Sequence, residues 1–185
     1  AIVRCDPGGA FAAAAGGIQA DEDALPFTAA GFDLVVAAGT LDTVNDLPGA
    51  LTLVRRALRP DGLFLGAFAG AGSLPRLRAA FRAADPGAAR LHPQIDVRAA
   101  GDLLLRAGFA LPVADTEALE ARYADLFALI ADLRGMAATS VLVGRTPLTR
   151  TTLAAAAAAF AAQADPDGRV SERFEVIFLT GWAPA

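Results

Sequence analysis

Short apolar runs alternate with helical stripes along this chain and predict an α/β fold. The runs Phe32–Ala38, Leu63–Phe68 and Phe174–Gly181 have the length and continuous apolar character of strands in a covered sheet. Between them, apolar residues recur at three- and four-residue spacing over Pro48–Leu58 and Val97–Ala107, as in helices that pack on a sheet. Strands that alternate with helices in this way predict a mostly parallel sheet.

Polar residues follow the strands expected in the first part of the chain. A strand over Ile2–Cys5 is followed by Asp6, and a short strand over Ile18–Ala20 is followed by three acids, residues 21–23. The next apolar run is expected to be buried on both faces, and it leads into the polar turn Thr40–Asp46. Open α/β sheets bind ligands outside the carboxyl ends of their strands. These acids and this turn are therefore the first candidates for chemistry.

Residues typical of helix ends mark several of the expected helices. Asp46 and Ser73 each stand where a helix N-cap is expected, and Gly108 stands where a helix C-terminus is expected. Thr149 or Thr151 starts an alanine-rich helix, whose small side chains would allow close packing in a homo-oligomer.

Composition and charge exclude several classes of function. The chain has 185 residues, a net charge of −4, one histidine and one cysteine. A nucleic-acid binder would show a basic face, and a His/Cys metal site needs more ligands than these, so neither is expected. The single Cys5 fits a reducing compartment such as the cytoplasm. The run Leu153–Ala162 is too short to span a membrane, and the N-terminus lacks the features of a signal peptide.

The assembled motifs resemble the class I S-adenosylmethionine-dependent methyltransferases. The first motif is an acid-ended strand, IVRCD, and the second is an acid-ended short strand that leads into L-P-F, IQADEDALPF. The third contains F-D-L-V, GFDLVVAAGTLDTVND, and the fourth places R-P-D-G before a buried strand, RPDGLF. Further segments are similar to one branch, the bacterial BioC-like methyltransferases and the related mitochondrial complex I assembly factor: VNDLPGAL, LLLRAGFALPVAD and FEVIFLTGWAP. The resemblance implies a Rossmann-like sheet with an antiparallel C-terminal strand. It also implies a single domain over residues 1–185, with a helical substrate-side insertion around 70–149.

The resemblance implies a set of residues that bind S-adenosylmethionine. Asp6 matches the acid that binds the ribose hydroxyls, although it could simply open the Asp-Pro-Gly turn. Asp21 matches the acid that accepts from the adenine amino group, with Glu22 beside it, although three acids in a row also suit a solvated loop. Ala37 and Gly39 would lie beside the methionine part and the methyl group, where small residues allow close approach. Alternatively, Gly39 only ends a strand.

The chain departs from the family at its N-terminus. The family's first strand and its Gly-rich loop, of the form D-x-G-x-G-x-G, should precede Ile2, and cofactor binding depends on that loop. Two explanations fit: an incomplete record of a longer protein, or a degenerate relative in which the strands Ile2–Cys5 and Phe32–Ala38 pair directly. An apolar run with no polar face is expected to have two strand neighbours, which favours the longer protein.

A second departure lies in the turn after the third expected strand. The branch commonly reads L-H-W-V-N-D-L-P-G, whereas this chain has Asp42 and Thr43 in place of the two ring residues. A desolvated carboxylate can act as a general base, which makes Asp42 a weak catalytic candidate, but a turn or helix-entry role is more usual. Loss of the ring pair is also what an inactive relative would show.

The leading hypothesis is a methyltransferase that acts on a small molecule or a protein. The alternative is a non-catalytic binding or assembly factor, and hydroxylation of a protein arginine is also associated with this branch. Two aromatic residues outside the motifs have weaker claims. His92 is a remote candidate for a base, and Tyr123 would line a substrate cavity or, more commonly for an aromatic residue, pack in the core.

Overall fold

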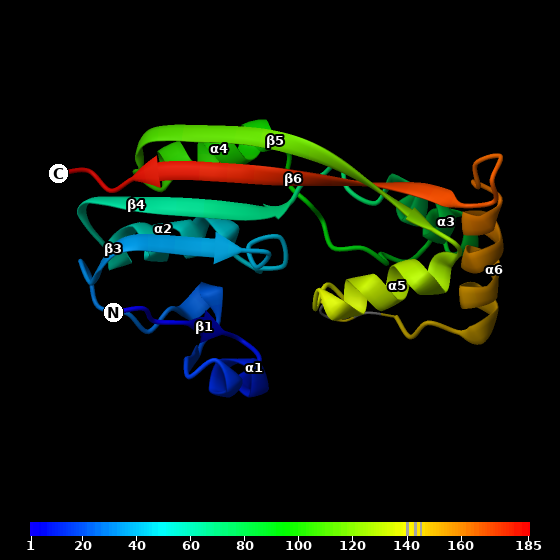
Figure 1. Cartoon of the computed structure of the whole chain (residues 1–185), viewed down its shortest axis with the longest axis horizontal. Coiled ribbons are helices and arrows are strands. Elements are labelled where there is room, and N and C mark those ends of the chain that lie inside the picture. Colours follow the sequence, from blue (N-terminus) through cyan, green and yellow to red (C-terminus); the bar gives the residue numbers. More distant parts are fainter. Residues whose placement is uncertain (140, 143, 145) are drawn as a thin grey trace. The chain divides into compact units, whose positions relative to one another are not determined.

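The computed structural model describes residues 1–139, 141–142, 144 and 146–185 as an alternation of strands and helices (Figure 1). In chain order the elements are β1 (Cys5–Asp6), α1 (Gly9–Ala14), β2 (Ile18–Gln19), the 3-10 helix η1 (Glu22–Ala24), β3 (Phe32–Ala38), α2 (Leu47–Ala57), β4 (Leu58–Ala69), α3 (Pro75–Ala84), α4 (Val97–Arg106), β5 (Ala110–Tyr123), α5 (Leu126–Gly135), α6 (Arg150–Ala161) and β6 (Val170–Trp182). The expected elements are present, with ends that differ by a few residues.

The chain packs as two compact units. The first contains Ala1–Phe68, Val97–Asp115 and Ile177–Ala185, and the second contains Ala69–Asp96 and Thr116–Val176. This division concerns packing, so the expectation of a single domain stays a prediction. In the part of the chain that the structure describes, no helix is long and apolar enough to cross a membrane.

The larger sheet has four strands in the order β3-β4-β6-β5. Strands β3 and β4 are parallel, with Val35 opposite Phe64 and Ala37 opposite Gly66. Figure 1 shows β6 running opposite to its neighbours β4 and β5. The fold prediction of a mostly parallel sheet with an antiparallel C-terminal strand is therefore confirmed.

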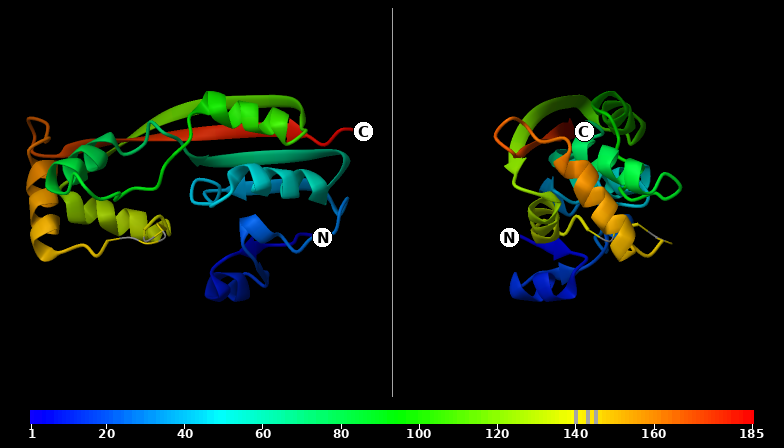
Figure 2. Two further views of the ribbon diagram at one scale, coloured as in Figure 1. Left: turned by 180° about the vertical axis from the view of Figure 1, so that it is seen from behind. Right: turned by 90° about the vertical axis from the view of Figure 1, so that its right-hand side faces the viewer.

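Helices α2 and α4 cover one face of this sheet (Figure 2). Their buried stripes include the predicted apolar residues Leu51, Val54, Leu103 and Leu104. Burial of one such side chain contributes about 1.5–3 kcal/mol, so these stripes hold the helices on the sheet. Gly108 follows α4 with a φ of +84°, as its place after the helix predicted.

The prediction that the Phe32–Ala38 strand is buried on both faces is wrong. Its exposure alternates, and Leu34 and Val36 are 49% and 61% exposed. The covering helices α2 and α4 lie on one face of the sheet, and these two side chains are not covered. In this respect β3 has the alternating burial of a strand with one covered face.

The first two strands form a separate sheet. Strands β1 and β2 pair in parallel, with Cys5 opposite Ile18 and Asp6 opposite Gln19. Among the described residues β3 has one strand neighbour, β4, and β1 does not pair with it. The structure therefore contradicts the alternative in which the first strand pairs directly with Phe32–Ala38. Ile2 and Val3, expected in the first strand, precede β1 and are exposed.

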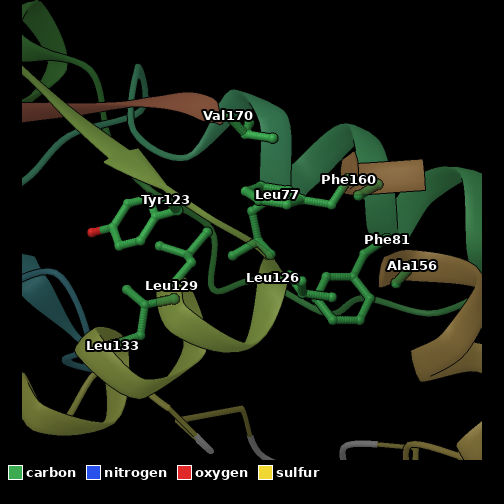
Figure 3. Close-up of a cluster of buried hydrophobic side chains, with 10 residues drawn as sticks. Leu77, Phe81, Tyr123, Leu126, Leu129, Leu133, Ala156, Phe160 and Val170 are labelled. Carbon is green, nitrogen blue, oxygen red and sulfur yellow. The ribbon is translucent and has the colours of Figure 1, made fainter. Parts of the chain in front are cut away.

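In the second unit, helices α3, α5 and α6 enclose an apolar core (Figure 3). Phe160, Leu126 and Leu129 are almost completely buried in it. Thr149 caps α6, since its Oγ1 accepts the N–H of Thr152 at 3.0 Å. Whether α6 also contacts a second copy of the chain stays a prediction, since the contacts described are those it makes with α3 and α5.

The prediction that Ser73 caps the helix ending at Ala84 is wrong. Helix α3 begins at Pro75, and the carboxylate of Glu172 on β6 accepts its N–H groups from Arg76 (3.1 Å) and Leu77 (2.8 Å). The hydroxyl of Ser73 instead bonds the backbone of Glu175 on β6, donating to its carbonyl oxygen at 3.0 Å and accepting its N–H at 2.9 Å. A carboxylate from a distant strand has taken the place of a local cap.

Candidate functional site

Asp6 lies at the carboxyl end of β1, half-buried beside the start of a turn. Its Oδ1 accepts the N–H of Gly8 at 2.7 Å, so the turn-opening role is present. Within the described part of the chain its Oδ2 has no hydrogen-bond donor, and a carboxylate oxygen has two acceptor sites. One side chain can therefore hold the turn and still accept from a ligand.

Asp21 and Glu22 lie at the neighbouring strand end, two and three residues after β2. Asp21 caps η1, because its Oδ1 accepts the N–H of Asp23 at 3.0 Å. Its side chain is exposed, whereas Glu22 is half-buried. Because β1 and β2 are parallel and adjacent, their carboxyl ends bring Asp6 close to this pair.

The pKa of the Cys5 thiol is affected by all three acids. Burial raises the pKa of Cys5, and the negative charges of Glu22, Asp6 and Asp21 raise it further. The thiol also donates to the carbonyl oxygen of Ala20 at 3.5 Å, which places it between the two strands. The predicted ribose and adenine acids thus share one negative patch. A patch of this kind favours ligands with hydrogen-bond donors or positive charge.

The end of β3 is open. Gly39 has a φ of +70°, which favours glycine, and its N–H donates to the carbonyl oxygen of Ala67 at 2.7 Å. A Cβ at Gly39 would meet no atom within 4 Å, so the space beside this backbone is empty of protein. Ala37 is half-buried inside β3. Gly39 therefore ends the strand and also leaves room beside it.

Asp42 lies half-buried in the turn, next to Leu41, which is 2% exposed. The N–H and hydroxyl of Thr43 both lie within 3.4 Å of the carbonyl oxygen of Thr40, which tightens the turn. Asp46 caps α2 as predicted, because its Oδ1 accepts the N–H of Gly49 at 3.0 Å. This geometry is that of a helix entry, and a catalytic role of Asp42 stays a prediction.

Asp23 is a further residue of this site to which the sequence motifs assign no role. Its Oδ2 accepts the N–H of Asn45 and its Oδ1 accepts the N–H of Asp46, each at 3.1 Å. It therefore joins the acid-rich loop to the turn after β3. No local pattern predicts this bridge, since its partners lie 22 and 23 residues away along the chain.

His92 and Tyr123 lie in the second unit. His92 Nδ1 donates to the carbonyl oxygen of Pro93, the next residue, at 2.8 Å. Tyr123 is 7% exposed and packs in the core, as its core interpretation predicted, with its hydroxyl pointing away from the other labelled side chains (Figure 3). Burial, followed by a hydrogen bond to Asp132, raises the pKa of Tyr123 to about 12.

Comparison with known proteins finds a family match over the candidate site of the first unit. Residues 5–66, which contain the acid-rich loop and the open end of β3, match the family model described as a methyltransferase domain. The resemblance to the class I methyltransferases is confirmed. The methyltransferase match covers every candidate site residue named above: Asp6, Asp21, Glu22, Ala37, Gly39 and Asp42.

Two relatives represent the branch predicted from the motifs. The chain is 34% identical over 174 residues to the mitochondrial arginine-hydroxylase NDUFAF5 of Danio rerio, which covers 90% of this chain and 54% of that protein. It is 37% identical over 169 residues to the malonyl-[acyl-carrier protein] O-methyltransferase of Xylella fastidiosa, which covers 90% of this chain and 57% of that protein. The chain thus spans about half the length of these curated relatives.

A solved structure supports the fold assignment. The YcgJ protein of Bacillus subtilis superposes with a TM-score of 0.61 over 95% of this chain and 76% of its own, at 15% sequence identity. At this identity the match concerns the fold.

Proposed function

We propose that this chain is part of an S-adenosylmethionine-dependent methyltransferase that acts on a small molecule or a protein. The observation that carries the proposal is the gathering of Asp6, Asp21 and Glu22 at adjacent carboxyl strand ends within the segment that matches a methyltransferase domain. Ligands of open α/β sheets bind at such strand ends.

The acids fit the adenosine part of the cofactor. Two neighbouring ribose hydroxyls are donors, and Asp6 has unused acceptor capacity on Oδ2. The adenine amino group is also a donor, and we assign Asp21, with Glu22 beside it, as its acceptor.

The end of β3 fits the methionine part. Gly39 leaves open space at the backbone, and Ala37, two residues earlier in β3, is also small. When bound, the cofactor would supply an electrophilic methyl carbon on a sulfonium sulfur, to which an acceptor nucleophile bonds in line as the C–S bond breaks and S-adenosylhomocysteine leaves. The residues of this chain need only hold donor and acceptor in line and keep water out, and such positioning supplies a large part of many rate enhancements.

The acceptor is assigned only as a class. One relative carries the name of an enzyme that methylates malonyl-acyl-carrier protein, which favours an oxygen nucleophile on a protein-bound or small substrate. Asp42, in the turn after β3, is the candidate base for an acceptor that must lose a proton. We also propose a single methyltransferase-like domain with a helical substrate side, in a cytoplasmic bacterial protein.

A non-catalytic binding or assembly role is the second candidate. The replacement of the ring pair by Asp42 and Thr43 favours it, because the side chains that would face the acceptor differ from those of the branch. The relatives also carry two different activities at similar identity, one a methyl transfer and one an arginine hydroxylation. A fold shared by several activities leaves the reaction to the site residues.

Calorimetry with S-adenosylmethionine and S-adenosylhomocysteine tests the proposal. In a longer chain that carries the Gly-rich loop on which cofactor binding depends, we expect binding of both ligands and a higher melting temperature at saturating ligand. Asp6→Ala should abolish most of the affinity, whereas Asp102→Ala, at an exposed acid of α4, should not change it. Absence of binding by that longer chain would contradict the methyltransferase proposal and favour the second candidate.

A further inference from the structure

Asp23 uses both oxygens of its carboxylate on the backbone of another segment. The N–H of Asn45 donates to Oδ2 and that of Asp46 to Oδ1, both at 3.1 Å. These two consecutive N–H groups lie just before α2, at the positive end of its dipole, where a carboxylate is favoured. Bonds from backbone N–H groups to an ionised acceptor are stronger than neutral ones.

Asp23 is also held by a hydrogen bond within its own loop. The backbone N–H of Asp23 donates to Oδ1 of Asp21, the acid assigned to adenine, at 3.0 Å. On the other side, Asp46 caps α2 through Gly49. A continuous set of hydrogen bonds therefore runs from the Asp21 carboxylate, through Asp23, to the last residues of the turn that follows β3.

We infer that Asp23 is a positioning residue that couples the adenine end of the cofactor site to the turn Thr40–Asp46 at its methyl end. The inference rests on the proposed function. A ligand that orders the loop at Asp21 also orders Asp23, and through it the turn. The turn is thereby set in place when the cofactor's adenine is bound, before an acceptor arrives.

Amide hydrogen exchange at residue resolution tests the inference without an assay of activity. In the ligand-free chain, Asp23→Asn replaces one acceptor oxygen by a donor, so the Asn45 and Asp46 amides should exchange about tenfold faster or more. Asp102→Asn makes the same change of charge at an exposed site in the same unit and should leave both rates unchanged. Equal rates in the Asp23→Asn and unmodified chains would overturn the inference.

The second arm adds saturating S-adenosylhomocysteine. In the unmodified chain and in Asp102→Asn, exchange at Asn45 and Asp46 should slow further. Asp23→Asn should still bind the ligand, measured by calorimetry, and should lack this additional protection. The same gain of protection in Asp23→Asn would show that the coupling does not pass through Asp23 and would overturn the inference.

Two outcomes separate this inference from the proposed function. Binding without added protection in the unmodified chain overturns the coupling and leaves the proposed function intact. Absence of binding overturns the proposed function and the coupling together, while the ligand-free arm still decides whether Asp23 holds the turn. If Asp23→Asn does not fold, Asp23→Glu keeps the charge with a longer side chain. It should protect the two amides less than Asp23 does, and full protection would contradict the bridge geometry.

Discussion

The two units of this chain use buried and surface carboxylates in opposite ways. In the second unit Glu172 is 0% exposed, and its two oxygens accept N–H groups from Arg76, Leu77 and Arg173. In the first unit Asp6 and Asp21 are more exposed, and each accepts one N–H with one oxygen. The protein uses both oxygens of Glu172, whereas Asp6 and Asp21 each use one oxygen and leave the other to accept from a ligand.

The difference separates a structural acid from a candidate ligand-binding acid. A buried carboxylate without donors would cost several kcal/mol, so Glu172 can exist in the core only because its donors satisfy it. Asp6 and Asp21 remain in contact with water and can exchange it for ligand donors. Asp23, in the first unit, resembles Glu172 because each of its two oxygens accepts an N–H from the protein.

The largest expected effect is on Glu172. Glu172→Ala removes the acceptor of two α3 N–H groups and should lower the free energy of unfolding by about 3 kcal/mol or more. Glu120→Ala, at an exposed acid of β5, is the matched control and should change it by less than about 0.5 kcal/mol. Urea denaturation measures both changes in the free energy of unfolding. A small change for Glu172→Ala would contradict a structural role for this acid.

Asp6→Ala should change ligand affinity strongly and stability little, the opposite of what we expect for Glu172→Ala. If Asp6 binds two ribose hydroxyls, its loss should weaken the binding of S-adenosylhomocysteine by about a hundredfold. Its effect on stability should be small, because it removes one turn bond at a half-buried site. Calorimetry and urea denaturation on the same variant give both numbers. Unchanged affinity together with a large loss of stability would show that Asp6 has a structural role, as Glu172 does, and does not bind the ligand.

The single tyrosine offers a test of burial in the second unit. The pKa of Tyr123 is raised from its usual 10 to about 12, so the folded state keeps the proton that the unfolded state loses. Its contribution to stability is complete below about pH 10 and should be lost as the pH rises to about 12, on the order of 2 kcal/mol. The chain has one tyrosine and its basic residues are all arginine, so few other groups titrate there.

Ultraviolet absorbance of the tyrosinate, followed against pH, gives the Tyr123 midpoint directly. Tyr123→Phe should remove the loss of stability over this pH range, as judged from thermal melts at fixed pH values. A midpoint at the usual tyrosine value would show that solvent reaches the hydroxyl.

Asp21→Asn should have a smaller and more selective effect in the first unit. If Asp21 accepts from the adenine amino group, the variant should lose about tenfold in affinity for S-adenosylhomocysteine. It should lose less for the inosine analogue, which has an oxygen in place of that amino group. Competition calorimetry with the two ligands measures the preference. Loss of affinity for both ligands alike would point to a role of Asp21 in shaping the loop through Asp23.

The smallest effect concerns the thiol inside the negative patch. Glu22 is the largest charge contribution that raises the pKa of Cys5, so Glu22→Gln should lower that pKa. The thiolate fraction, and with it the rate of alkylation by iodoacetamide, should then rise at lower pH than in the unmodified chain. Glu120→Gln on β5 is the control. An unchanged pH profile would place Glu22 outside the patch.

Local patterns predicted much of the fold. The apolar stripes of α2 and α4 were readable because a helix face repeats every three to four residues, and Asp46 and Thr149 because a cap lies beside the helix that it serves. The acids were predicted as candidates because ligands of open α/β sheets bind at carboxyl strand ends. The parallel pairing of β1 and β2 then brings Asp6 close to Asp21 and Glu22. The assignment of these acids to a cofactor came from the motifs and stays a proposal.

Tertiary structure decided the features that depend on distant partners. The expected cap Ser73 was displaced by Glu172, which lies about a hundred residues away along the chain. The strand Phe32–Ala38 reads as buried on both faces, yet Leu34 and Val36 are exposed, because burial depends on which elements cover a face.

The sequence by itself determined the alternation of strands and helices, the resemblance to a methyltransferase family, and the positions of the candidate acids. Only the tertiary structure decided which acids have both oxygens bonded by the protein and which have an oxygen left to accept from a ligand. The physical reason is that periodicity and capping act over a few residues. Saturation of a carboxylate depends on donors brought from elsewhere in the chain, as for Asp23 at Asn45 and Glu172 at Leu77.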